Sequence, residues 1–131
     1  MHSNRYTLEF EGSEIASVAE CDGDLVVRFS AAAATDDSSR TEGHLQSVEL
    51  IVHQASWRGH LGLCFGRLSS GSLAAEGATS TGASRLPVPH QSHLPVRLEL
   101  LFRNGEALAV GGASVTLRTN GPTAFFESYA C

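Results

Sequence analysis

The sequence predicts an all-β fold, either an antiparallel β-sandwich or a flattened barrel, built from eight to ten short strands. Three observations predict it: apolar and polar residues alternate with a period of two along most of the chain, turn signals separate the alternating segments, and no segment has the period of an amphipathic helix. A parallel α/β sheet is excluded, because its strands need crossover helices that this sequence does not contain.

Length and composition indicate one globular domain covering residues 1–131. Of these 131 residues, 42% are hydrophobic and 18% are charged, and the net charge is −5. A chain of this length forms one hydrophobic core, and this composition is not that of a disordered chain. All nine basic residues are arginine, a bias that indicates a GC-rich, bacterial source.

The first two strands are predicted over residues 6–11 and 15–21. Gly12-Ser13 is interpreted as a turn between them, and alternation slips within the second segment, which predicts a β-bulge. Asp22-Gly23 then predicts a tight hairpin, because glycine supplies the positive φ that primed turns require.

The returning strand begins at Leu25 and leads into the run Ala31–Ala34. That run is either the end of the strand or a short helix capped by Ser30. We favour the strand end followed by a loop, because the polar residues Thr35–Gly43 leave a helix no apolar face to bury.

The middle of the chain is predicted to contain strands at residues 45–53, 61–66 and 72–76. In the second of these, Leu61, Leu63 and Phe65 are expected to face the core and Cys64 to face outward. Residues 77–95 are rich in Gly, Ser and Pro, so they predict a long, mobile loop that is the most exposed segment for binding.

The last third of the chain has the clearest alternation. Asn104-Gly105 predicts a hairpin whose arms pair directly, and Gly111-Gly112 is interpreted as the break that ends its second arm. Asn120-Gly121-Pro122 predicts the last turn. The strands expected around these turns are residues 96–103, 108–110, 115–118 and 123–129.

Charge and cysteine content disfavour several classes of partner. The arginines are scattered singly and the net charge is negative, so neither nucleic acid nor an anionic membrane is an expected partner. Three widely spaced cysteines form no disulfide framework, and the amino terminus is polar and has no apolar core of a signal peptide. We therefore expect a cytoplasmic protein without a cofactor.

Histidines are the candidate metal ligands. His90 and His93 lie three residues apart in the proline-rich segment, with His53 or His60 as further ligands. The signal is weak, because no carboxylate or cysteine lies close in sequence and the His-x-His of a cupin site does not occur. Two solvated histidines on a polar loop are the favoured interpretation.

Two segments are candidate ligand sites. Trp57, Arg58 and His60 lie together after a strand, where the tryptophan forms either a stacking platform or a lid over the open end of the sandwich. In the loop of residues 77–95, any partner contact should involve Arg85, His90 or His93. Cys64 lies four residues after His60, which on an extended strand is too far for proton transfer.

The sequence contains no catalytic motif, so the expected function is that of a non-catalytic binding or protein-interaction module. The alternative is a small-ligand- or metal-binding β-barrel with enzyme activity based on a histidine cluster. The partner is then another protein or a small molecule. Apolar outward residues such as Leu101 and Ile51 also predict a homo-oligomer.

Overall fold

The structure is a computed structural model, and it describes residues 5–75, 82–120 and 125–127. These residues form antiparallel strands and one short 3-10 helix, η1. No helix among them is long and apolar enough to cross a membrane. The elements are β1 (Tyr6–Cys21), β2 (Asp24–Asp36), β3 (Thr41–Leu45), β4 (Val48–His53), β5 (Ser56–Arg58), η1 (Leu61–Leu63), β6 (Gly66–Ala75), β7 (Arg85–Val88), β8 (His90–Ser92), β9 (Val96–Phe102), β10 (Ala107–Gly112), β11 (Ser114–Thr119) and β12 (Phe125–Glu127).

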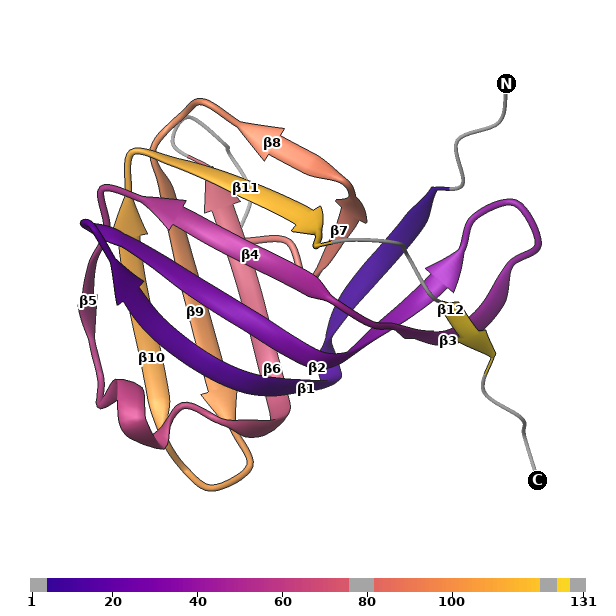
Figure 1. Cartoon of the computed structure of the whole chain (residues 1–131), viewed down its shortest axis with the longest axis horizontal. Helices are drawn as coiled ribbons and strands as arrows, with labels where there is room; N and C mark the ends of the chain where they lie inside the picture. The colour runs from indigo at the N-terminus through magenta and orange to yellow at the C-terminus, as the bar shows by residue number, and fades with distance from the viewer. Residues whose placement is uncertain (1–4, 76–81, 121–124, 128–131) are drawn as a thin grey trace.

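The strands form two layers of one continuous sheet that does not close (Figure 1). The order along the sheet is β5-β10-β9-β6-β1-β2-β4-β11-β8, and the first four strands form the layer behind the others in Figure 1. The predicted all-β antiparallel fold is therefore confirmed, and the open two-layered sheet fits the predicted sandwich or flattened barrel. The twelve described strands exceed the expected eight to ten, and β1 and β2 are long rather than short.

The hydrophobic core lies between the two layers. Inward positions alternate along the strands as the sequence predicts, most regularly on β9, where Val96, Leu98, Leu100 and Phe102 are buried. Phe10 of β1 is fully buried, and Gly71 of β6 makes room for it, because a Cβ on Gly71 would lie 2.7 Å from the Phe10 Cβ. Burial of this face is the main source of stability.

Gly12-Ser13 is not a turn, as the sequence suggested, but a large bulge inside β1. Glu9 pairs with Ala33 and Glu14 with Ala31, so β1 has three extra residues at this point. The fully buried Ser13 fills the gap: its Oγ donates a hydrogen bond to the Glu9 carbonyl (2.6 Å) and accepts one from the Ala33 N–H (2.9 Å). Because the bulge bends the strand, β1 pairs with β7 before it and with β6 after it, which joins the two layers.

The other expectations for the first hairpin are confirmed. Cys21 pairs with Asp24 around a two-residue turn in which Asp22 and Gly23 both have positive φ, 51° and 87°. The register shifts again between Ile15 and Ser17, where slipped alternation predicted a bulge. Ala31–Ala34 continue β2, so the helix alternative is wrong, because their backbone groups pair with β1 and β3.

Two segments differ from the prediction. Residues 61–63 form η1 instead of a strand, so Cys64 is buried, whereas Leu63 and Phe65 are 50% and 52% exposed. Three alternating residues do not distinguish a strand from a turn. In the predicted loop of residues 77–95, β7 and β8 are strands, and β7 tolerates Pro87 because it pairs on one side only. Residues 77–81 of that loop lie outside the described residues.

The C-terminal hairpin forms as predicted, with β9 and β10 pairing from Leu101 and Ala107 onward. The Asn104 side chain stabilises its turn, because Oδ1 accepts a hydrogen bond from the Glu106 N–H (2.8 Å) and Nδ2 donates one to the Leu63 carbonyl (2.9 Å). Gly111-Gly112 does not break the second arm: both glycines belong to β10. The last strand was predicted over residues 123–129, and the structure describes residues 125–127 of it as β12. The other residues of that strand lie outside the described residues, as do residues 121 and 122 of the predicted turn before it.

Replacing Gly105 with valine should destabilise the fold by about 1–3 kcal/mol. Gly105 has a φ of 95°, which a β-branched residue adopts only with strain. No heavy atom lies within 4 Å of a Cβ at this position, so the effect tests backbone conformation without a steric clash. Thermal and urea unfolding measure it, and an unchanged melting temperature would contradict the turn assignment.

Candidate functional site

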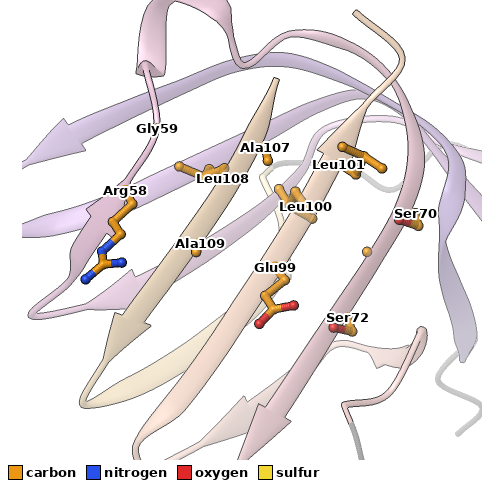
Figure 2. Close-up of a pocket in the computed structure, with 11 residues that line it drawn as sticks. Arg58, Gly59, Ser70, Ser72, Glu99, Leu100, Leu101, Ala107, Leu108 and Ala109 are labelled. Carbon is orange, nitrogen blue, oxygen red and sulfur yellow. The ribbon is translucent and has the colours of Figure 1, made fainter. Parts of the chain in front are cut away.

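A groove runs over the outer face of the layer β5–β10–β9–β6, and we call it the β10 groove. Its larger part is a hollow of about 590 Å³. An adjoining hollow of about 440 Å³ shares Arg58, Glu99 and Ala109 with it. Figure 2 shows the larger part, in which the Arg58 and Glu99 side chains project on opposite sides of Ala109. The groove is large enough for a small ligand.

The groove exists because two neighbouring strands carry outward residues of very different size. The outward positions of β10 hold small residues, namely Ala107, Ala109 and Gly111. Those of β9 hold long residues, namely Arg97, Glu99 and Leu101. Because paired residues of adjacent strands lie side by side, the small row forms a floor and the long row forms a wall.

Three charged side chains face this floor without a partner. Arg58, Arg97 and Glu99 make no ion pair or side-chain hydrogen bond with any residue that the structure describes. Glu99 pairs with Ala109, which pairs with Arg58, so their backbones are two strand spacings apart, or about 10 Å. Two guanidinium groups and one carboxylate give the groove a net positive charge in a chain whose net charge is −5.

The structure separates the predicted cluster at residues 57–60. Trp57 is partly buried against the core and pairs with Val110, and it also lines the smaller hollow. Arg58 is exposed and lines both parts of the groove. His60 precedes η1 and lines neither part; its backbone N–H donates to the Glu106 carboxylate (2.8 Å).

The predicted residues of the proline-rich segment lie on and beside β7 and β8, which are drawn in the upper part of Figure 1. Arg85 and His90 line a separate hollow of about 410 Å³ bordered by β6, β7 and β8. Arg85 also lies 3.8 Å from the Glu9 carboxylate, its cross-strand neighbour. His93 is exposed between β8 and β9 and does not line this hollow.

Sequence reasoning missed Arg97 and Glu99 as candidate ligand contacts. Their outward position was predicted from the alternation of β9, but charged residues on an outer strand face are normally solvated. The available signal was the row of small residues at alternate positions of the next strand, Ala107, Ala109 and Gly111. Small outward residues on one strand beside long outward residues on the next indicate a groove once the two strands are known to pair.

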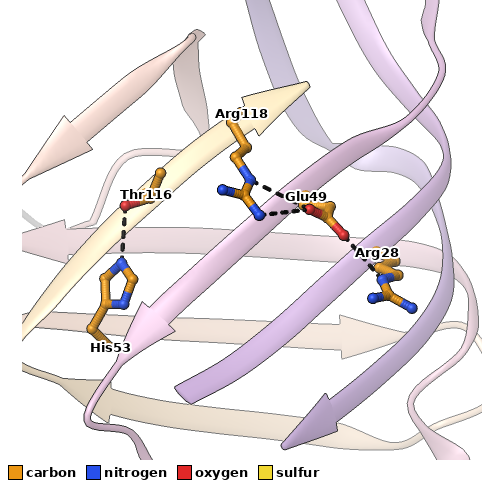
Figure 3. Close-up of polar contacts among 5 residues, drawn as sticks. All are labelled: Arg28, Glu49, His53, Thr116 and Arg118. Atoms are coloured by element: carbon orange, nitrogen blue, oxygen red, sulfur yellow. Dashed lines mark hydrogen bonds and ion pairs between the residues drawn. The ribbon is translucent and has the colours of Figure 1, made fainter. Parts of the chain in front are cut away.

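A second polar cluster covers the outer face of β2, β4 and β11 (Figure 3). Glu49 of β4 is 5% exposed and lies between two arginines on the neighbouring strands. Arg28 Nε donates to one carboxylate oxygen (3.0 Å), and Arg118 Nη2 approaches the other at 3.3 Å. These partners offset the cost of burying the carboxylate, so their removal would leave a buried charge without compensation.

His53 lies on the same face and connects a hydroxyl to a carboxylate. Its Nε2 is 2.9 Å from Thr116 Oγ1 and its Nδ1 is 3.2 Å from Asp24 Oδ2. The backbone N–H of Gln54 and the His53 imidazole hold the pKa of Asp24 below its usual value. The order hydroxyl, imidazole, carboxylate resembles that of a catalytic triad with a nucleophilic hydroxyl. However, β11 is paired on both edges at Thr116, which commits the nearby backbone N–H groups to the sheet.

Cys64 is unsuited to nucleophilic catalysis. Burial and the nearby charge of Glu106 raise the pKa of its thiol to about 11, so the thiolate is scarce at neutral pH. Its Sγ donates a weak hydrogen bond to the His60 carbonyl at 3.3 Å. The sequence placed this side chain outward, which is wrong: it fills the core beside η1.

The described residues contain no group of three or more His, Cys, Asp or Glu side chains that could hold a metal ion. His60 lies beside η1, whereas His90 belongs to β8; Figure 1 shows η1 at the lower left and β8 at the top. Comparison with protein-family models, curated proteins and solved structures found no match to this chain. The function is therefore inferred from the site alone.

Proposed function

We propose that this domain is a non-catalytic binding module whose ligand lies in the β10 groove. One observation carries the proposal: Arg58, Arg97 and Glu99 surround a floor of small residues and have no partner among the described residues. A hollow with an apolar floor and a few converging polar groups is the usual form of a ligand site.

The chemistry of the lining favours binding over catalysis. The residues that line the groove include neither histidine nor cysteine, and Glu99 is their only carboxylate. Nucleophilic catalysis needs a nucleophile within hydrogen-bond reach of a base, and general acid–base catalysis needs a group that transfers a proton to or from the reacting atom. Ser56, Ser70 and Ser72 are the available hydroxyls, and none of them makes a side-chain hydrogen bond within the part of the chain that the structure describes.

Filling the groove should abolish binding without unfolding the protein. Ala109 faces outward, so Ala109→Trp places an indole on the groove floor and leaves the core intact. Chemical-shift mapping with a set of small carboxylic acids, their amides and short peptides should perturb the amides of β10 in the wild type. Those changes should disappear in Ala109→Trp.

The matched control is Ala19→Trp, at an exposed position of β1 in the other layer. This variant should retain the shift changes of the wild type. The proposal is wrong if no compound of the set perturbs β10, or if the perturbation survives in Ala109→Trp.

The alternative function, an enzyme that uses histidine chemistry, now depends on a single histidine, His53, which contacts Thr116 and Asp24. A fluorophosphonate probe tests it, because such probes label activated hydroxyl groups. We expect no labelling, since the paired β11 offers no free N–H groups to stabilise an oxyanion. Labelling of Thr116 that is lost in His53→Asn would favour the enzyme instead.

A further inference from the structure

The β10 groove has an apolar half and a charged half, and this division indicates what kind of ligand fits. Leu101 and Ala107 line the larger hollow only, and Leu101 is 42% exposed. Arg97 and Gly111 line the smaller hollow only. Arg58, Glu99 and Ala109 lie at the boundary, because they line both. An occupant of the whole groove needs an apolar part and a polar end.

The charges define that polar end further. Arg97 and Glu99 lie two residues apart on the same face of β9, and Arg58 lies across Ala109 from Glu99. Guanidinium groups bind carboxylates with strong, directional hydrogen bonds. The carboxylate of Glu99 requires a donor, such as an amide N–H. A simple fatty acid supplies no donor and would face Glu99 with like charge.

The length of the floor and the pairing of its strand fix the mode of binding. Ala107, Ala109 and Gly111 span about 14 Å, which matches roughly four residues of extended peptide. Over residues 109–111, β10 pairs with β5 on one edge and β9 on the other. A peptide therefore cannot add to this part of β10 as a further strand. It must lie on the outer face of the sheet, along the floor of the groove.

We propose that the β10 groove binds the carboxyl-terminal end of an extended peptide whose last residues are apolar. The terminal carboxylate lies between Arg58 and Arg97, the last amide N–H donates to Glu99, and the apolar side chains lie over Ala109 and Ala107 beside Leu101. This assignment rests on the proposed binding function and specifies its ligand. The charges of the groove and of this ligand are complementary: Arg58 and Arg97 attract the terminal carboxylate, and Glu99 accepts a hydrogen bond from the adjacent amide N–H.

Fluorescence anisotropy tests the assignment with an amino-terminally labelled pentapeptide of alternating alanine and valine that ends in a free leucine carboxylate. We expect its carboxyl-terminal amide to bind about tenfold more weakly. Arg97→Gln should weaken binding of the free acid by about the same factor and leave binding of the amide unchanged. Arg97 is exposed and unpaired among the described residues, so this variant should melt like the wild type.

Arg103→Gln is the matched control, because Arg103 is exposed in the β9–β10 turn and does not line the groove. It removes the same charge and should leave the affinity for the free acid unchanged. The assignment is overturned if acid and amide bind equally, if Arg97→Gln and Arg103→Gln weaken binding equally, or if the peptide does not bind.

Two further outcomes would assign the groove to another occupant. Octanoate that binds as tightly as the peptide would indicate a simple carboxylate. Binding of a second copy of the chain, detected as a dimer that Ala109→Trp abolishes, would indicate self-association. Either result overturns the peptide assignment and leaves the groove a binding site. By contrast, absence of any perturbation of β10 by the compound set would contradict the proposed function itself.

Discussion

Gly112→Ala is expected to lower the free energy of unfolding by about 3 kcal/mol. A Cβ on Gly112 would overlap Cγ1 of Val52 and lie 2.7 Å from the carbonyl oxygen of His53. That carbonyl accepts a hydrogen bond from the Ala113 N–H at 2.8 Å, so it cannot move away without disturbing the β10–β11 connection. Urea unfolding monitored by circular dichroism measures the change.

Gly111→Ala is the matched control, because Gly111 precedes Gly112 on the same strand. A Cβ on Gly111 meets nothing closer than Ser56 Oγ at 4.0 Å. This variant should be neutral or slightly stabilising, since alanine restricts the unfolded chain more than glycine does. Equal destabilisation by both substitutions would contradict the packing of β10 against β4.

The double variant Arg28→Gln/Arg118→Gln is expected to lose about 2–3 kcal/mol of stability. Both cations lie beside Glu49, whose side chain is 6% exposed, so their removal leaves a buried carboxylate without a counter-charge. The reverse change, Glu49→Gln alone, should cost less. Its two arginines have side chains that are 64% and 55% exposed, and water can solvate them.

Adding Glu49→Gln to the double variant distinguishes electrostatics from packing. The triple variant should recover most of the lost stability, because the neutral amide needs no counter-charge. The wild type, the double variant, Glu49→Gln and the triple variant form a thermodynamic cycle. Thermal unfolding of these four proteins measures the recovery. A triple variant as unstable as the double variant would show that the arginines act through the packing of their stems rather than through their charges.

Local signals in the sequence predicted much of the fold. Alternation identified most of the strands, and the requirement for positive φ identified the hairpin at Asp22-Gly23. The prediction failed where a local signal had two meanings. Gly12-Ser13 has the composition of a turn, but pairing of β1 with β2 on both sides of it makes it a bulge. Likewise, the apolar alternation at residues 61–65 is short enough to fit the turn of η1.

The candidate site was less predictable. Arg58 was named from its place beside Trp57, but Arg97 and Glu99 were recognised only as outward residues of a strand. The sequence does not show that Ala109 lies between Glu99 and Arg58 in the sheet, because β5 and β10 are about fifty residues apart in the chain. The sequence also does not show that His53, His60 and His90 belong to different parts of the fold.

By itself, then, the sequence determined the class of the fold, the inward face of most strands and the position of its tight hairpins. These follow from the backbone, whose period of two and local φ requirements act over a few residues. The tertiary structure decided which strands are neighbours, that β1 joins the two layers, and that Arg58, Arg97 and Glu99 surround one floor. The physical reason is that alternation specifies the face of a side chain, whereas register between distant strands specifies its neighbours.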